Sequence, residues 1–269
     1  MCSSDLEPAA LDAAERELAG TAPAAVVVTE WTEQVATAPD DERFPALTAG
    51  LAHGVDPLPV SFAQLRILIE PDPAHPVFNI PFAFVLDGEL DERALRSSLD
   101  AILERHEGWR TGFGRNDDGS WYQFVRPFDG FDLDVVDLSR LPESQRAAEA
   151  SRLASAIAQE RLELAGPLVR GLLLRMGPRR HALAFSVHHL ISDGWSTNLW
   201  CAEFSELYTA ARLGRSPALR DLPVHYPDYS VWQRSWLSGE RLEQELALGG
   251  RVVDDEDFLD RHEIGRAHV

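Results

Sequence analysis

The sequence predicts an α/β (α+β) fold in which helices pack on a mixed sheet, and three observations support this prediction. Hydrophobic runs of strand length occur at residues 78–86 and 181–189. Amphipathic helical patterns separate such runs and alternate with them irregularly along the chain. The 269 residues are 45% hydrophobic and 26% charged, which is an ordinary globular composition with enough apolar residues for a sizeable core.

Local signals in the first half of the chain predict two helices, a strand and a hairpin. Ser61 is a candidate N-cap for a short helix that ends near Ile69, where prolines follow. Residues 78–86 are a predicted buried strand, and Asp91 then caps a helix. The apolar face of that helix carries Leu95, Leu99, Ile102 and Leu103. Residues 109–113 and 121–125 are a predicted hairpin, with a turn over 116–119.

The second half predicts further strands and two longer helices. The expected elements are a strand at 131–138, a helix at 142–164, strands at 168–176 and 181–189 joined by a turn at 177–178, and a helix that Ser196 opens and Gly214 ends. The strands that begin at Phe78, Trp109 and His181 are candidates for one sheet. Helices on one face of that sheet are the simplest way to bury the apolar patterns.

Charge and apolar content exclude several partners. The net charge of −19 would repel a phosphate backbone, so we expect no nucleic-acid partner. No apolar run is long enough to cross a bilayer and no signal-peptide pattern opens the chain, so we expect a cytoplasmic protein without a membrane partner. Two cysteines, Cys2 and Cys201, provide neither a disulfide framework nor metal-ligand spacing.

The two ends of the chain have an unusual relationship. One codon spelling of residues 263–269, translated on the opposite strand, gives Val-Cys-Ser-Ser-Asp-Leu, and residues 1–6 are Met-Cys-Ser-Ser-Asp-Leu. We therefore expect both ends to be adapter-like artefacts and the chain to be a fragment of a longer gene. Residues 7–56 are rich in Ala, Thr, Pro and acids, which suggests a linker or the tail of an upstream segment.

The chemistry-bearing stretch is residues 187–196. A strand pattern runs into His188 and His189, followed by Asp193 and Gly194, and an aromatic helix pattern comes next. Histidine titrates near neutral pH, so it can exchange a proton where lysine or tyrosine cannot. A buried, hydrogen-bonded pair is the common alternative for adjacent histidines. Because alternate residues of a strand face opposite ways, only one of the two can face a site, and periodicity does not say which.

Four motifs in order carry a resemblance to a known family. They are residues 61–66 (Ser-Phe-Ala-Gln-Leu-Arg), 105–113 (Arg-His-Glu-Gly-Trp-Arg-Thr-Gly-Phe), 188–196 (His-His-Leu-Ile-Ser-Asp-Gly-Trp-Ser) and 226–232 (Tyr-Pro-Asp-Tyr-Ser-Val-Trp). Together they resemble the opening motifs of condensation domains from nonribosomal peptide synthetases, in the His-His-x-x-x-Asp-Gly (HHxxxDG) acyltransferase superfamily. The resemblance covers residues 57–246, fades over 247–262, and implies a chloramphenicol-acetyltransferase-like N-terminal lobe only, without the C-terminal lobe that closes a tunnel in the family.

Some positions depart from the family pattern. Ile67 follows Arg66 where an aromatic residue is usual, and Trp109 replaces a usual leucine. His188 argues against the heterocyclisation subtype, and Trp195 argues mildly against epimerisation domains. The form of the third motif resembles domains that accept an L-configured donor.

The resemblance also implies roles for individual residues. His189 would face the tunnel and act on the attacking amine, as a base or as a positioning group, while His188 would be structural. Asp193 would be a structural acid, paired with an arginine of the absent lobe or holding local backbone N–H groups. Gly194 would leave room for a turn and for a pantetheine arm. Ser196 is a candidate helix cap.

Other motif side chains have simpler expected roles. Arg66 and Arg110 would be salt-bridge partners or solvated surface residues. The aromatic residues of the fourth motif, together with the nearby Trp236, would be core residues. They are Tyr226, Tyr229, Trp232 and Trp236.

The implied reaction is amide-bond formation between thioesters carried on phosphopantetheine arms, with no directly bound cofactor and no metal. The implied partners are upstream and downstream peptidyl carrier proteins, an adenylation domain and the C-terminal lobe. A stand-alone acyltransferase of the same superfamily and a non-catalytic carrier-binding lobe are alternatives. A serine hydrolase is disfavoured because no Gly-x-Ser-x-Gly elbow occurs, and a zinc site is disfavoured because adjacent strand histidines point apart.

Overall fold

A computed structural model describes residues 47–244 and residue 247. The expected adapter-like ends (1–6 and 263–269), residues 7–46 of the expected linker and residues 248–262 of the fading segment lie outside the described residues. None of the helices in the described part of the chain has the length and apolar content of a membrane span. The backbone N–H of Ala52 donates to Asp228 at 2.8 Å, so residues just before the first strand are tied to the rest of the fold.

A four-stranded mixed sheet forms the centre of the fold, in the order β2-β7-β6-β5. Its strands are β2 (Asn79–Asp87), β5 (Leu133–Asp137), β6 (Val169–Gly177) and β7 (Arg180–His188). β7 pairs antiparallel with both β2 and β6, whereas β5 runs parallel to β6. The mixed sheet was predicted from the sequence, and so was the tight turn between β6 and β7.

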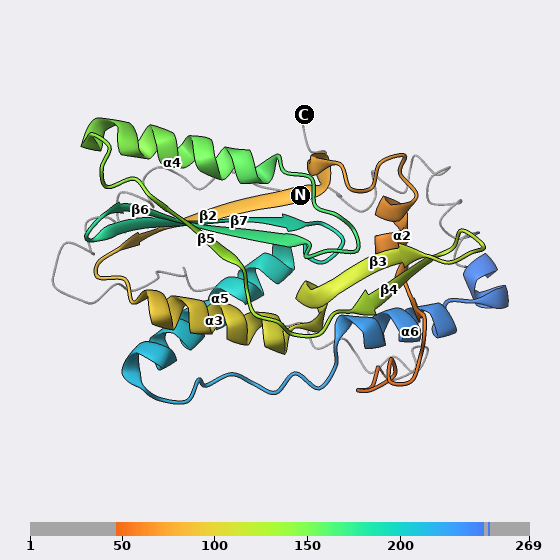
Figure 1. Cartoon of the computed structure of the whole chain (residues 1–269). Helices are drawn as coiled ribbons and strands as arrows, with labels where there is room; N and C mark the ends of the chain where they lie inside the picture. Colours follow the sequence, from red (N-terminus) through yellow and green to blue (C-terminus); the bar gives the residue numbers. More distant parts are fainter. Residues whose placement is uncertain (1–46, 245–246, 248–269) are drawn as a thin grey trace, which may run out of the picture.

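Helices cover both faces of this sheet, not one face as expected. Figure 1 shows α4 (Glu143–Ala158) on one side and α3 (Glu92–Arg105) with α5 (Gly194–Leu213) on the other. The strands β6 and β7 carry buried apolar residues on both faces, and each face needs a cover. Leu173, Leu183 and Phe185 pack towards α3 and α5, while Leu174 and Ala184 pack with the residues of α4.

The expected grouping of the hairpin with the large sheet is wrong. The strands β3 (Thr111–Arg115) and β4 (Trp121–Val125) pair with β1 (Leu58–Pro59) in a separate three-stranded sheet, in the order β1-β4-β3. Phe113 of β3 is buried in a different apolar cluster from the one that fills the large sheet, together with Leu68, Leu162 and Leu168. Figure 1 shows this small sheet beside α2 (Phe62–Leu68) and α6 (Tyr226–Trp236).

Several element boundaries differ from the prediction. Helix α4 ends at Ala158, not at residue 164, because Leu162 leaves the helical path to fill the cluster around Phe113. Trp109 lies in the 3₁₀ helix η2 (Glu107–Arg110) that precedes β3. A second 3₁₀ helix, η1 (Pro76–Phe78), follows the prolines after α2. Ser61 and Asp91 are N-caps as predicted, and Gly214 ends α5 with a left-handed φ of 64°.

Candidate active site

A cleft of about 620 Å³ opens where the large sheet ends beside the small one. Its lining comes from α2, from η2, from the segment after β7, from the first turns of α5 and from the start of α6. The four motifs found in the sequence supply most of these residues. The fold therefore brings together segments that are far apart in the chain, from Ala63 of α2 to Tyr229 of α6.

His189 lies one residue beyond the end of β7 and lines the cleft. Its backbone N–H donates to the carbonyl of Phe78 at 2.8 Å, which holds the residue against the start of β2. Its Nδ1 lies 2.9 Å from the carbonyl oxygen of Ser192. Because a carbonyl only accepts, Nδ1 carries the hydrogen and Nε2 keeps a lone pair. An exposed imidazole in this tautomer can accept a hydrogen bond or a proton from a molecule in the cleft.

His188 is fully buried, with 0% of the residue exposed. Its Nε2 donates to the carbonyl of Pro73 at 2.9 Å, and its Nδ1 accepts the backbone N–H of Leu190 at 3.1 Å. Both ring nitrogens are satisfied only in the neutral form. Burial lowers the pKa of this imidazole to about 4, although the bond to Pro73 opposes the shift. The side chain fastens the loop before η1 to the end of β7.

Asp193 is the N-cap of α5, and its Oδ1 accepts from the backbone N–H of Ser196 at 2.8 Å and from the hydroxyl of Ser196 at 2.6 Å. Ser196 is therefore the third residue of the helix and not its cap. Burial raises the pKa of the Asp193 carboxyl, but the two bonds from Ser196 outweigh it and the net pKa is lowered. The sequence left two partners open for the Asp193 carboxylate, an arginine of the absent lobe or local backbone N–H groups. Among the described residues, the backbone N–H of Ser196 is the partner that it has.

Gly194 and Trp195 form the exposed first turn of α5 beside the cleft. The backbone of Gly194 is not left-handed, so the turn itself does not require glycine. A Cβ added there would meet no other atom within 4 Å. The indole of Trp195 is 69% exposed and lines the cleft. The helix thus begins with open space at one residue and a large apolar surface at the next.

The two motif arginines have different environments. Arg66 is exposed on α2 and lines the cleft, without an ion pair to another described residue. Arg110 is half-buried and donates to three backbone carbonyls, those of Leu103, Glu104 and Arg126. Arg110 is thus neither of the alternatives considered for it. It holds the end of α3 to the end of β4, which is a structural role.

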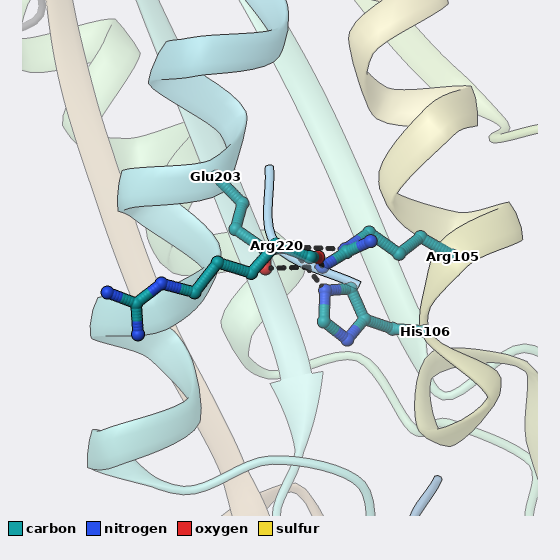
Figure 2. Close-up of polar contacts among 4 residues, drawn as sticks. All are labelled: Arg105, His106, Glu203 and Arg220. Atoms are coloured by element: carbon teal, nitrogen blue, oxygen red, sulfur yellow. Dashed lines mark hydrogen bonds and ion pairs between the residues drawn. The ribbon is translucent and has the colours of Figure 1, made fainter. Parts of the chain in front are cut away.

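The structure also forms an ionic cluster beside the cleft that sequence reasoning missed. Figure 2 shows the carboxylate of Glu203 between Arg105 and His106. The Arg105 Nε and the His106 Nε2 lie 3.1 Å and 2.6 Å from Glu203 Oε2. Burial raises the pKa of Glu203, but hydrogen bonds from His106 and Arg105 outweigh it and lower the pKa overall. Glu203 lies three positions after Trp200 on the apolar face of α5, and a carboxylate at such a position signals a buried partner.

This cluster joins α5 to the end of α3 and the start of η2, beside the cleft. Glu203 lies nine positions after Gly194, which is roughly 13 Å along the helix at 1.5 Å per residue. The indole of Trp200, one turn earlier, stacks on Trp109 with ring centroids 5.6 Å apart. Together these contacts hold η2 against α5.

The aromatic residues of α6 are not core residues as expected. Tyr229, Trp232 and Trp236 are half-buried, and Tyr226 is 40% exposed and lines the cleft. The hydroxyl of Tyr226 lies 2.9 Å from that of Ser61, the N-cap of α2. The first and fourth motifs thus meet at one hydrogen bond.

No group of three or more His, Cys, Asp or Glu side chains suitable for a metal ion occurs among the described residues. Cys201 is a half-buried thiol of α5, and burial raises its pKa to about 11, so it stays protonated at neutral pH.

Comparisons of the sequence with known proteins find one family model and several long synthases that match this chain. The sequence model of the Condensation domain family matches residues 55–248. A linear gramicidin synthase from Brevibacillus parabrevis is 40% identical over 201 residues, which are 72% of this chain and 3% of the relative. Chondramide synthase cmdD from Chondromyces crocatus is 38% identical over 203 residues, which are 74% of this chain and 5% of the relative. The chain thus spans a small part of these long synthases.

Solved structures share the fold. The starter condensation domain of rhizomide synthetase RzmA superposes with a TM-score of 0.63 at 24% identity, over 71% of this chain and 47% of that one. The first condensation domain of the calcium-dependent antibiotic synthetase gives a TM-score of 0.63 at 23% identity, over 73% and 47%. The chain covers about half of each solved structure. With the family match over most of its length, this chain belongs to the condensation-domain family of nonribosomal peptide synthetases.

Proposed function

We propose that this chain takes part in forming an amide bond between an acyl donor held as a thioester and the amine of an aminoacyl acceptor. Both substrates would arrive on phosphopantetheine arms of carrier proteins, so the chain itself needs no bound cofactor. The observation that carries the proposal is His189, an exposed imidazole in the cleft whose Nε2 keeps a free lone pair.

The chemistry fits this arrangement. The amine nitrogen adds to the thioester carbonyl carbon, and the π electrons move to oxygen. The nitrogen must then lose a proton, and the leaving thiolate must gain one. His189 Nε2 can orient the amine and relay that proton to sulfur. Holding two tethered substrates in one cleft supplies much of the rate enhancement, because it removes the entropy cost of their encounter.

The remaining residues support this role. His188 and Asp193 hold the loop that presents His189, since one fixes the end of β7 and the other caps α5. We propose that the open space at Gly194 admits a pantetheine arm. The form Ser192-Asp193-Gly194-Trp195 favours an L-configured donor by resemblance to such domains. The proposed partners are carrier proteins on either side, an adenylation domain and the C-terminal lobe.

The test uses the complete synthetase that contains this chain, supplied with two carrier-loaded aminoacyl thioesters. We expect dipeptide formation, and we expect His189→Ala to reduce it by about 10²-fold or more. His53→Ala removes an exposed imidazole outside the cleft and should retain full activity. Unchanged turnover in His189→Ala would defeat the catalytic assignment.

The alternatives predict different products. Acylation of a free alcohol from a coenzyme A thioester, without dipeptide, would indicate a stand-alone acyltransferase of the same superfamily. Binding of carrier proteins with neither product would indicate a non-catalytic lobe.

A further inference from the structure

Tyr226 and Ser61 share a hydrogen bond, and the surroundings of Ser61 show which of the two hydroxyls donates. Ser61 is fully buried, and its Oγ accepts the backbone N–H of Gln64 at 3.1 Å as part of the helix cap. The other polar atom near this Oγ is the Tyr226 hydroxyl at 2.9 Å. The buried Ser61 O–H needs an acceptor, and Tyr226 is the one available among the described residues.

Ser61 is therefore the donor in this pair. The reverse direction would leave a hydroxyl hydrogen unsatisfied in the interior, which costs about 1–3 kcal/mol. When Tyr226 accepts from Ser61, its own O–H must point elsewhere. The side chain is 40% exposed and lines the cleft, so this O–H is available there as a donor.

The contacts also place Tyr226 near the loop that carries His189. Ser61 caps the first turn of α2, and Gln64 in the same turn lies with its Nε2 3.4 Å from the carbonyl of Leu190. Leu190 directly follows His189. The pKa of Tyr226 is raised, first by burial and also by the charges of Tyr229 and Asp193, while the Ser61 bond opposes the shift. The phenol therefore keeps its proton at neutral pH.

A tetrahedral intermediate needs such a donor. When the amine adds to the thioester carbonyl, the oxygen becomes an oxyanion, and a donor aimed at it lowers the barrier. The lone pair of His189 cannot serve, because it is an acceptor. The cleft also contains Arg66 on α2, but its side chain has no described partner that would hold it in one position.

We propose that the Tyr226 hydroxyl donates a hydrogen bond to the thioester carbonyl oxygen and stabilises the oxyanion that forms there. This inference rests on the proposed condensation function. The phenol keeps its proton throughout. The oxyanion collapses to an amide, the carbon–sulfur bond breaks, and the thiolate receives the proton that the nitrogen loses through His189.

The test is Tyr226→Phe in the complete synthetase. We expect kcat for dipeptide formation to fall about 10²-fold, in the range measured for loss of one oxyanion donor, with KM changed less than about twofold. The affinity for a phosphonate mimic of the tetrahedral intermediate should fall with kcat, whereas affinity for a non-reactive thioester analogue should not. Tyr122→Phe is the matched control, because Tyr122 lies on β4 outside the cleft and loses the same phenolic oxygen.

A second variant separates this role from simple damage to the helix cap. Ser61→Ala removes the cap acceptor of the Gln64 N–H and the partner of the Tyr226 hydroxyl, but it keeps the phenolic O–H. If Tyr226 is an oxyanion donor, Ser61→Ala retains most of the kcat that Tyr226→Phe loses. An equal loss of kcat in Ser61→Ala, an unchanged kcat in Tyr226→Phe, or equal weakening of both analogues would overturn the inference. Absence of dipeptide from the wild-type synthetase would instead reject the proposed function itself.

Discussion

His188 and His189 are adjacent in sequence and have opposite roles in the structure. Both ring nitrogens of His188 are hydrogen-bonded, one to the Pro73 carbonyl and the other to the Leu190 N–H. The ring of His189 lies in the cleft, where its Nδ1 is bonded to Ser192 and its Nε2 has no partner among the described residues. The difference arises because β7 ends at His188, so the next residue leaves the sheet. One histidine is thus a structural residue of the core and the other is a candidate for proton transfer.

The buried histidine makes stability depend on pH. Burial lowers the pKa of His188 to about 4 in the folded chain, against an ordinary value of 6.5, so only the unfolded chain binds a proton between these values. Stability is therefore fully present above pH 6.5 and is lost as the pH falls towards 4. Between pH 7.5 and pH 5 we expect a loss of roughly 2 kcal/mol in the free energy of unfolding, measured by urea titration.

Two variants check the source of this loss. His188→Gln should reduce the drop, and His181, whose pKa is also lowered by burial, should account for what remains. His189→Ala should keep the drop that His188 causes, since it leaves the buried ring of His188 in place. A wild-type chain equally stable at both pH values would contradict the assignment.

At the scale of elements, α5 links the large sheet to the cleft. Its apolar face buries Trp200, Phe204 and Leu207, and its first turn lines the cleft with Trp195 and Ser196. Trp200 stacks on Phe204 at 4.9 Å and meets Phe185 of β7 edge-on at 4.8 Å. The helix is thus fixed to the sheet along its length, and its first turn depends on the cap.

The cap makes a measurable contribution. Asp193→Ala should lower the free energy of unfolding by about 1 kcal/mol, because the N–H of Ser196 loses its acceptor. For a domain of this size we expect a fall in Tm of about 2–4 °C in a thermal scan. Asp193→Asn keeps an acceptor and should lose less. Asp117→Ala removes the same charge from an exposed turn and should leave Tm unchanged, so an equal fall in both alanine variants would rule out capping as the cause.

At the scale of the whole molecule, the cleft lies between two sheets that pack around separate apolar clusters. Trp195 and Leu199 expose 69% and 46% of their surface along one wall of this cleft. Large exposed apolar groups of this kind mark surfaces that another partner covers. We propose that the C-terminal lobe expected from the family resemblance is that partner.

The isolated 269-residue chain should therefore form no dipeptide and should self-associate. Replacing Trp195 and Leu199 together by Gln should shift the chain towards monomer in sedimentation velocity, since less apolar surface is gained on association. Arg152→Gln on the exposed side of α4 is a surface control that should leave association unchanged. Measurable condensation by the chain alone, or a wild-type chain that stays monomeric at all concentrations, would contradict this prediction.

Much of the fold and part of the site followed from the sequence. The caps at Ser61 and Asp91 and the turn between β6 and β7 were predictable, because each depends on residues within three or four positions. The membership of β3 in a second sheet was not, because it depends on Phe113 meeting Leu162 in a cluster that no local pattern encodes. The end of α4 at Ala158 was not predictable either, because it depends on Leu162 joining the same cluster.

Sequence alone determined the order of most helices and strands, although it predicted neither β1 nor α6, and the four motifs identified the family. Only the tertiary structure decided which imidazole is buried and which lines the cleft, since strand periodicity is symmetric between the two faces. It also decided that Ser61 meets Tyr226, 165 positions away, and that Arg105 and His106 share Glu203. The physical reason is range: caps and turns are hydrogen bonds between near neighbours, whereas these contacts form only once packing has brought distant segments together.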